Sequence, residues 1–200
     1  LPFELDADVN LDTLLDHRPY TLRSQRGRDI FSLQAKIVEA YRVALRTRDF
    51  IEFQAPALVG GDAEGGAAVF KVEYFKGVAN LATSPQLYKQ IMVGVFERVF
   101  TIAKIFRAEK SATTRHTSEL TQMDFEMGFI ENEQDVMDTL RDVIRDVVQA
   151  VSPYEDIFER FNTTIPLAPK TFPTLTLREA QEIIKREFGR DQGGEDDMSP

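Results

Sequence analysis

The sequence contains no cysteine, only two histidines and no long apolar run. The absence of cysteine excludes disulfides and thiolate metal ligands, and it is compatible with a reducing cytosol. Because His17 and His116 are the two imidazoles, a metal site built from several histidines is disfavoured. No stretch of about 18 apolar residues is present, so the sequence predicts no membrane-spanning helix.

Positive charge is also scarce. There are 24 lysine and arginine residues against 33 acidic residues, which gives a net charge of −9. This balance argues against a surface that binds phosphates generally, although it leaves room for a small basic pocket. The 200 residues, 42% of them hydrophobic, suffice for one sizeable domain with a core. Residues 1–12 lack the basic and apolar regions of a signal peptide, so we expect none, and we expect a cytoplasmic location.

Hydrophobic periodicity and turn residues predict a mixed order of helices and strands. The expected elements are an extended, turn-rich arm at 1–26, a helix at 27–49, a strand at 50–56, paired strands at 69–74 and 78–83, a helix from Ser84, two strands flanking a charged stretch, and helices at 132–151 and 176–189. Short turns, such as Lys76-Gly77, join adjacent strands. We therefore expect an α+β fold, with an antiparallel sheet flanked by helices. The tail ends on Ser199-Pro200, a helix-start pair, so we expect the domain to continue beyond it.

The charged stretch is "IFRAEKSATTRHTSELTQMDFEMG", residues 105–128. Successive side chains of a strand point to opposite faces, so Arg107 and Glu109 share one face, and Asp124 and Glu126 share one face. The alternate positions are apolar and predict a packed face. The other face therefore presents polar groups of both signs.

The segment that connects these two strands adds Arg115 and His116. Two arginines and a histidine that converge with carboxylates suit an anionic ligand, because a guanidinium can hold a phosphate at two points. The alternative is a solvated hairpin with exposed ion pairs, which contribute little to stability. The charge pattern alone leaves both interpretations open.

A second candidate site is "TSPQLYKQ", residues 83–90. Ser84 and Gln86 lie at a predicted helix N-terminus, which favours a carboxylate, and Lys89 adds a full positive charge one turn later. The alternative is a simple cap followed by a solvated lysine. The residues that we expect this helix to bury are Leu87, Ile91, Met92, Val95 and Phe96.

The stretch "FRAEKSATTRHTSELTQMDFEM" resembles motif 2 of the class II aminoacyl-tRNA synthetases, in the subgroup for aspartate, asparagine and lysine. "FIEFQAP" resembles motif 1 with Pro56 as its proline, and "LDHRPYTLR" resembles the link that precedes the catalytic domain. The resemblance implies the class II catalytic fold, with 1–26 as the linker and 27–200 as the N-terminal part of the catalytic domain. Motif 3 is absent from the sequence, so the fold is expected to be incomplete.

The resemblance also implies roles for the charged side chains. Arg107 would bind the α-phosphate of ATP and stabilise the charge that develops there, which makes it the catalytic residue. Glu109 would contact the adenine amine, and Arg115 and His116 would contact the outer phosphates. Asp124 would hold the amino group of the amino acid.

"SPQLYKQ" resembles the aspartyl members of the subgroup. In them the lysine at the place of Lys89 pairs with the side-chain carboxylate of the substrate, and Ser84 and Gln86 belong to the same site. The glycine-rich loop "GGDAEGG" resembles their mobile substrate loop, in which Glu64 would face the substrate ammonium; its alternative is a plain flexible connector. One departure is Leu120, where many relatives place an aromatic residue against adenine.

The resemblance implies a two-step reaction, in which aspartate and ATP form aspartyl-adenylate and the aspartyl group then moves to tRNA. The implied cofactor is Mg²⁺, with ATP as substrate; no metal ligand is assigned in this sequence. The implied partners are tRNA(Asp), a homodimer mate through motif 1, and no membrane. Charging of tRNA(Asn) as well, as in the non-discriminating and archaeal-like members, stays open.

Two other functions also stay open. An asparagine-synthetase-like paralogue would make the same adenylate and pass it to ammonia. A non-catalytic synthetase-like module would only bind; the missing motif 3 favours it, whereas Arg107, Glu109 and Lys89 speak against it.

Overall fold

The computed structural model describes residues 3–4, 7–61, 68–108 and 117–194. The chain divides into two compact units, 1–167 and 168–200, and each is described by itself. Within the described ranges, no helix combines the length and the apolar character that crossing a membrane requires.

The N-terminal arm is partly helical, so the prediction of an extended segment was wrong there. Helix α1 spans Leu11–Asp16 and helix α2 spans Arg18–Thr21. The side chain of Asn10 accepts a hydrogen bond from the Thr13 amide at 2.8 Å and so caps α1. A proline in the first turn of α2 fixes the backbone dihedral that a helix start needs.

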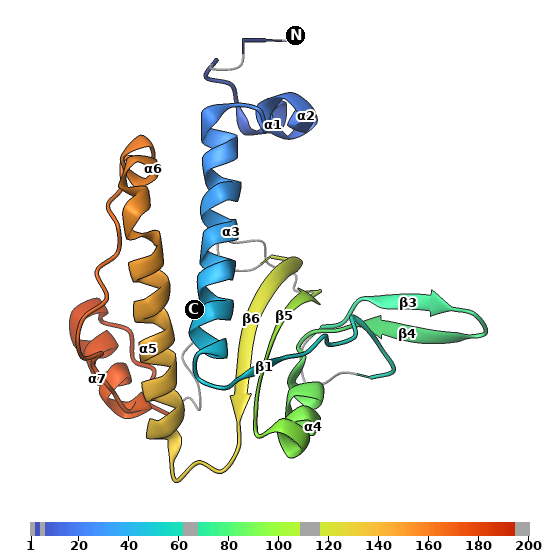
Figure 1. Ribbon diagram of the computed structural model, residues 1–200, viewed down its shortest axis with the longest axis vertical. Helices are drawn as coiled ribbons and strands as arrows, with labels where there is room; N and C mark the ends of the chain where they lie inside the picture. The colour runs from blue at the N-terminus through green and yellow to red at the C-terminus, as the bar shows by residue number, and fades with distance from the viewer. Residues whose placement is uncertain (1–2, 5–6, 62–67, 109–116, 195–200) are drawn as a thin grey trace. The chain divides into compact units, whose positions relative to one another are not determined.

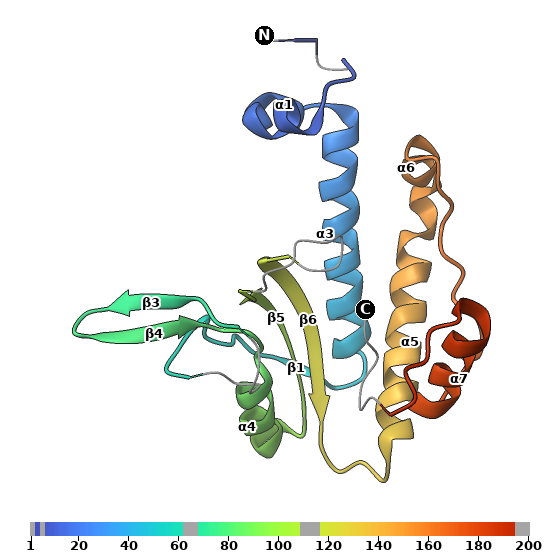
Figure 2. The same cartoon turned by 180° about the vertical axis from the view of Figure 1, so that it is seen from behind.

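Two long helices lie side by side and carry the core (Figures 1 and 2). Helix α3 spans Gln25–Arg46 and begins two residues earlier than predicted, because the Ser24 hydroxyl accepts from the Gly27 amide. Helix α5 spans Glu133–Val151, with Asn132 as its predicted cap.

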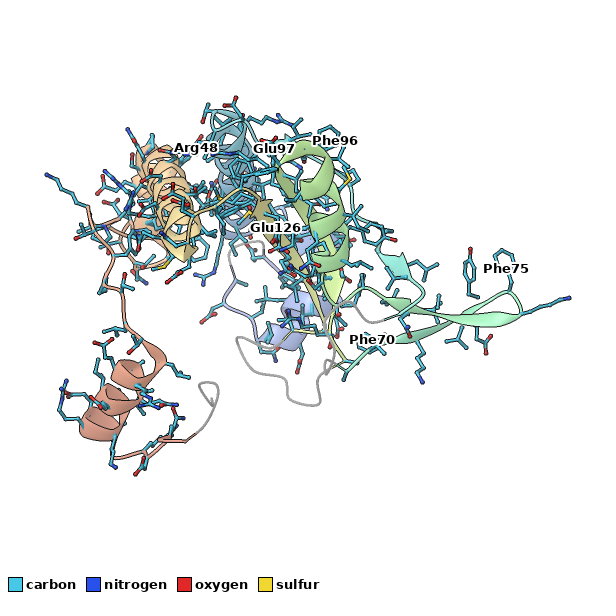
Figure 3. The ribbon with its side chains drawn as sticks, turned by 90° about the horizontal axis from the view of Figure 1, so that it is seen from below. Arg48, Phe70, Phe75, Phe96, Glu97 and Glu126 are labelled. Atoms are coloured by element: carbon cyan, nitrogen blue, oxygen red, sulfur yellow. The ribbon has the colours of Figure 1, made fainter. Side chains whose placement is uncertain are left out.

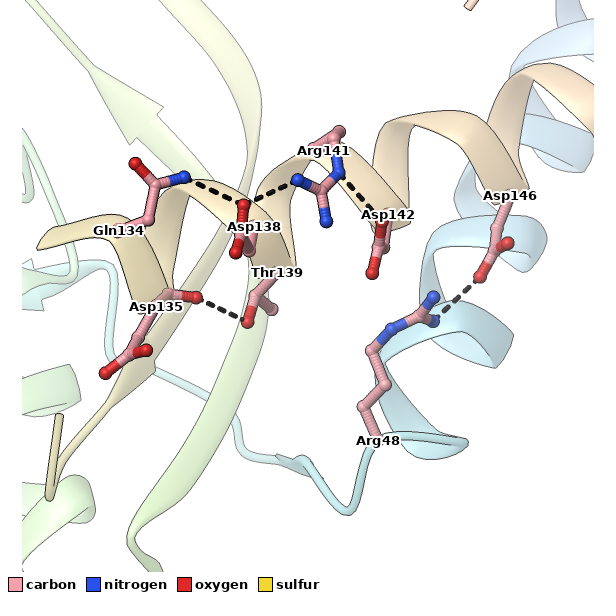
Figure 4. Close-up of polar contacts among 8 residues, drawn as sticks. All are labelled: Arg48, Gln134, Asp135, Asp138, Thr139, Arg141, Asp142 and Asp146. Atoms are coloured by element: carbon pink, nitrogen blue, oxygen red, sulfur yellow. Dashed lines mark hydrogen bonds and ion pairs between the residues drawn. The ribbon is translucent and has the colours of Figure 1, made fainter. Parts of the chain in front are cut away.

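An ion pair links the two helices at the end of α3. Arg48 Nη1 lies 2.7 Å from Asp146 Oδ2 of α5 (Figure 4). The same view shows the polar face of α5, where Arg141 contacts the carboxylates of Asp138 and Asp142. Arg141 and Asp138 are three residues apart, a spacing at which an ion pair stabilises a helix modestly.

The main sheet has the order β1-β5-β6. Strands β5, Arg98–Phe106, and β6, Glu119–Met127, pair antiparallel over nine positions, as predicted. Strand β1 is only Ile51–Glu52 and pairs parallel with β5, so the expectation of an antiparallel sheet was wrong for this pair. Parallel neighbours need a long crossover, and residues 53–97 provide it.

Strand β1 is tied to α3 by charge. The carboxylate of Glu52 accepts from Arg42 Nε at 3.0 Å and from Arg46 Nη2 at 2.7 Å. Both arginines lie on α3, so the helix fixes the short strand from outside the sheet.

A second sheet has the order β2-β4-β3 and is antiparallel throughout. Its strands are β2, Leu58–Val59, β3, Lys71–Tyr74, and β4, Gly77–Leu81. The predicted hairpin is confirmed, but its turn lies at Phe75 and Lys76, one residue earlier than expected. Phe75 stands at the outer end of the hairpin (Figure 3) with a positive φ of 50°.

The core lies on one face of the main sheet, against α3 and α5. Phe100 of β5 meets Tyr41 of α3 edge to face, and Phe125 of β6 meets Phe50 in the same way. The buried residues of this cluster are Tyr41, Ala44, Leu45, Phe50, Phe100 and Val143.

Helix α4, Gln86–Phe96, packs against β5 and β6. The prediction that it buries Leu87, Ile91, Val95 and Phe96 was wrong, because each of these side chains is more than two-fifths exposed. The helix instead turns Lys89 inward. Its sequence is apolar on most sides, so periodicity could not tell which face meets the sheet.

Shorter elements complete the two units. In the first unit, the 3₁₀ helix Ser152–Tyr154 leads into α6, Glu155–Arg160, and Arg160 Nε lies 2.6 Å from the buried carboxylate of Asp29 on α3. In the second unit, α7 spans Leu177–Phe188 and starts with the predicted capping box of Thr176 and Glu179.

Candidate active site

The start of α4 positions the first group of candidate residues. The helix begins at Gln86, two residues after Ser84, and the Ser84 hydroxyl accepts a hydrogen bond from the Gln86 amide at 3.1 Å. Ser84 is buried and Gln86 is half-buried. Lys89 follows one turn later, so its side chain leaves the helix toward β6.

Lys89 is the central charge of the site. Its side chain is only 9% exposed, and Nζ lies 3.5 Å from Asp124 Oδ2 and 3.3 Å from Glu126 Oε2. The alternative interpretation of Lys89 as a solvated helix residue is therefore wrong. A buried ammonium needs counter-charges, and β6 provides two.

Strand pairing explains why these carboxylates face α4. Asp124 lies opposite Thr101 and Glu126 lies opposite Val99, whereas the alternate positions of β6 face the core. Gln122 shares the polar face and donates from Nε2 to Asp124 Oδ1 at 3.1 Å. The sheet thus has one apolar face and one face with an ordered row of polar groups, as predicted from the alternation.

Several buried polar atoms on this face have no hydrogen-bond partner among the described residues. They are Thr101 Oγ1, Gln122 Oε1 and Asp124 Oδ2. Buried polar groups are nearly always hydrogen-bonded in folded proteins, so a cluster of such atoms beside a lysine marks a place for a polar ligand.

Tyr41 has a further buried oxygen of this kind, on the core side of the sheet. Burial, and to a lesser extent the charge of Asp124, raise the pKa of the Tyr41 hydroxyl well above its usual range. The hydroxyl therefore remains protonated at neutral pH and is available as a donor.

Arg107 directly follows β5 and continues its pairing. Its amide donates to the Ser118 carbonyl at 3.0 Å, so the ladder between β5 and β6 extends beyond the strand ends. Alternation along the chain places Arg107 on the face that carries Thr101 and Ile105. Arg107 is half-buried and lies further along the same face than Lys89 and Asp124.

Four predicted site residues lie outside the described residues: Glu64, Glu109, Arg115 and His116. Their predicted roles stay predictions. The described part of the site consists of Lys89, Asp124 and Arg107, with Ser84 and Gln86 at the start of α4.

Sequence reasoning gave no role to Thr101, Gln122 or Glu126. A signal for Glu126 was present, since it shares a strand face with Asp124. Thr101 also had a signal, because it is a hydroxyl in the otherwise apolar stretch "VFTIA". Gln122 follows the same alternation as the two carboxylates.

Comparison with known proteins identifies the family of the chain. The family described as "tRNA synthetases class II (D, K and N)" matches residues 10–197. The chain therefore belongs to this family, and its α+β fold is the class II fold.

The individual relatives narrow the comparison. An aspartate–tRNA(Asp/Asn) ligase from Deinococcus radiodurans is 44% identical over 96% of this chain, and a cytoplasmic aspartate–tRNA ligase from Homo sapiens is 40% identical over 96%. A crystal structure of asparaginyl-tRNA synthetase from Pyrococcus horikoshii, complexed with asparaginyl-adenylate, superposes with a TM-score of 0.84 at 30% identity, over 92% of this chain and 44% of that one. The chain spans 45% and 40% of the two curated relatives.

Proposed function

We propose that the protein activates aspartate with ATP and transfers it to tRNA. The observation that carries the proposal is the buried ammonium of Lys89, held on the polar face of β6 in a chain of this family. An ammonium complements a side-chain carboxylate. Its interaction with the neutral side-chain amide of asparagine is much weaker, and it repels the ammonium of a lysine substrate.

Three of the described residues have separate roles in the first step. The α-carboxylate of aspartate attacks the α-phosphorus of ATP; a new P–O bond forms, and the bond to pyrophosphate breaks. Arg107 stabilises the negative charge that develops on the phosphorus oxygens. Lys89 binds the side-chain carboxylate of aspartate, and Asp124 accepts its ammonium, so catalysis rests on positioning and charge rather than on a protein nucleophile.

In the second step a ribose hydroxyl of tRNA attacks the aspartyl carbonyl, and AMP leaves. We propose tRNA(Asp) as the acceptor, with tRNA(Asn) as a second one to be tested, and we propose a cytoplasmic location. We propose Mg²⁺ as the counter-ion of ATP. The described residues contain no group of three or more histidine, aspartate or glutamate side chains that could hold a metal ion, and we assign Mg²⁺ no ligand in this chain.

A homodimer through motif 1 belongs to the same proposal. In this chain motif 1 comprises α3, β1 and Pro56, and the Glu52 carboxylate joins the helix to the strand through two arginines. Ile51 of β1 is 45% exposed, as a residue that contacts a second copy would be in an isolated chain. Analytical ultracentrifugation of the full-length protein tests this point.

One set of assays tests the function. The full-length protein is mixed with ATP, labelled pyrophosphate and either aspartate or asparagine, and tRNA or ammonia is then added as acceptor. Aspartate-dependent exchange followed by charging of tRNA supports the proposal. Exchange that depends on asparagine, formation of free asparagine from ammonia, or no exchange would refute it.

A further inference from the structure

We propose that Glu126 is a positioning residue that holds the Lys89 ammonium in place for the substrate carboxylate. This inference rests on the proposed function, because it concerns the same pocket. It assigns different duties to the two carboxylates that contact Lys89.

The geometry sets the number of contacts. A lysine ammonium has three N–H donors. Among the described residues, its two ion-pair partners are Asp124 at 3.5 Å and Glu126 at 3.3 Å. Two donors can therefore face the two carboxylates of β6 at ion-pair distance, and we assign the third to a ligand.

The two carboxylates differ in what they can do once a ligand arrives. Asp124 Oδ1 accepts from Gln122, and its buried Oδ2 makes the longer ion pair with Lys89, at 3.5 Å, and has no hydrogen-bond partner among the described residues, so Oδ2 is placed to accept a second cation, the substrate ammonium. When it does, its hold on Lys89 weakens, because one carboxylate then serves two cations. Glu126 lies opposite Val99, which is fully buried, and Lys89 is its ion-pair partner among the described residues.

Without Glu126, the ammonium of Lys89 has one carboxylate left, and it would pair fully with Asp124. That closed pair would occupy both the place of the substrate carboxylate and the place of its ammonium. By holding the ammonium of Lys89, Glu126 prevents this close pairing of Lys89 with Asp124. Figure 3 shows Glu126 beside α4, the helix that carries the lysine.

This role can be separated from a plain charge effect, since the two predict opposite signs. The described cluster has one positive and two negative charges, so removal of Glu126 reduces the repulsion that a dicarboxylic substrate meets. A pure charge effect would thus lower KM for aspartate. Loss of positioning would raise it.

The experiment measures pyrophosphate exchange by the full-length protein and two variants. Glu126→Ala is expected to raise KM for aspartate at least tenfold, with KM for ATP changed less than twofold. It is also expected to reduce the preference for aspartate over asparagine, as a ratio of kcat/KM, at least tenfold. Glu126→Asp keeps the charge but withdraws the carboxylate by about 1.5 Å, and it is expected to raise KM for aspartate at least threefold.

Glu119→Ala is the matched control. Glu119 lies on the same strand and pairs with Lys104 at 3.2 Å, but both side chains are more than half exposed. It should leave all constants within twofold of the wild-type values. Thermal unfolding of each variant checks that the fold is kept, and Glu126→Asp maintains the test if Glu126→Ala does not fold.

An unchanged or lower KM for aspartate in either Glu126 variant overturns the positioning role. A loss that affects ATP as much as aspartate overturns it too. Absence of aspartate-dependent exchange in the wild-type protein is a different result, since it overturns the proposed function and the inference with it.

Discussion

Replacement of Lys89 by leucine is the sharpest perturbation of the site. Leucine fills similar space but removes the one described positive charge that contacts Asp124 and Glu126. The hydrogen bond between an ammonium and a ligand carboxylate contributes about 1.5–3 kcal/mol. In the variant, two carboxylates would face the incoming substrate without a counter-charge. The repulsion between two like charges about 4 Å apart is about 4 kcal/mol at an effective dielectric constant of about 20.

Only part of that repulsion counts, because Asp124 and Glu126 are 15% and 29% exposed and become better hydrated once the lysine is gone. We therefore expect a loss of about 3–4 kcal/mol in aspartate binding, or a factor of about 10² to 10³. Binding of ATP depends on other groups and should change by less than threefold.

The assay is pyrophosphate exchange by the full-length protein with aspartate and ATP varied in turn. Lys104→Leu provides the control, because Lys104 also pairs with a carboxylate of β6, at 3.2 Å, but on the opposite face of the sheet from Lys89 and with both side chains more than half exposed. If Lys89→Leu left the affinity for aspartate within threefold of wild type, the carboxylate-binding role of Lys89 would be refuted.

Three further predictions concern stability, each measured by urea denaturation of the full-length protein. Tyr41→Phe should raise the free energy of unfolding by about 1 kcal/mol, because it removes a buried hydroxyl that has no hydrogen-bond partner among the described residues; a loss would mean that the hydroxyl is bonded. Leu45→Ala should lower it by about 2–5 kcal/mol, because Leu45 is fully buried in the core, and a loss below 1 kcal/mol would contradict that packing. The hydrogen bond from Arg160 lowers the pKa of Asp29 below its usual 3.8. The contribution of ionised Asp29 to the free energy of unfolding is therefore present above pH 3.8 and is lost as the pH falls through the lowered pKa. Asp29→Asn should therefore lower stability at pH 7 and flatten its decline below about pH 4, and an unchanged acid profile would refute this assignment.

Local signals predicted the elements that local chemistry determines. Asn132 and the pair of Thr176 and Glu179 mark helix starts because their side chains bond the free amides of the first turn, whatever the rest of the chain does. The pairing of β5 with β6 was also predictable, since apolar and polar residues alternate along both strands. The short helices α1 and α2 were missed because six-residue and four-residue helices leave almost no periodicity.

Features that depend on tertiary packing could not be predicted in the same way. Helix α4 has apolar residues on most sides, and only packing against β5 and β6 decides that Lys89 points inward. The parallel pairing of β1 depends on where the crossover brings the chain, which no short window of sequence contains.

The site shows the same division. Motif resemblance predicts roles for Lys89 and Asp124, whereas the contact between them depends on the register that sets Asp124 opposite Thr101. Glu126 was visible in the strand pattern but had no assigned partner, because a partner on another helix is not encoded by alternation.

Helix α4 ends at Phe96 and β5 begins at Arg98, so Glu97 alone joins them. Its backbone has a positive φ of 64°, and its amide still bonds back to Val93 (Figure 3 labels Glu97 at this corner). An α-helix advances about 100° per residue, so one residue inserted into this joint, with the strand fixed, would rotate the Lys89 side chain by more than a quarter turn and shift it along the helix axis. The length of this one-residue connection thus determines whether the Lys89 ammonium lies over the polar face of the sheet. Length variants, natural or designed, should be tolerated at the outer end of the β3–β4 hairpin but not between α4 and β5.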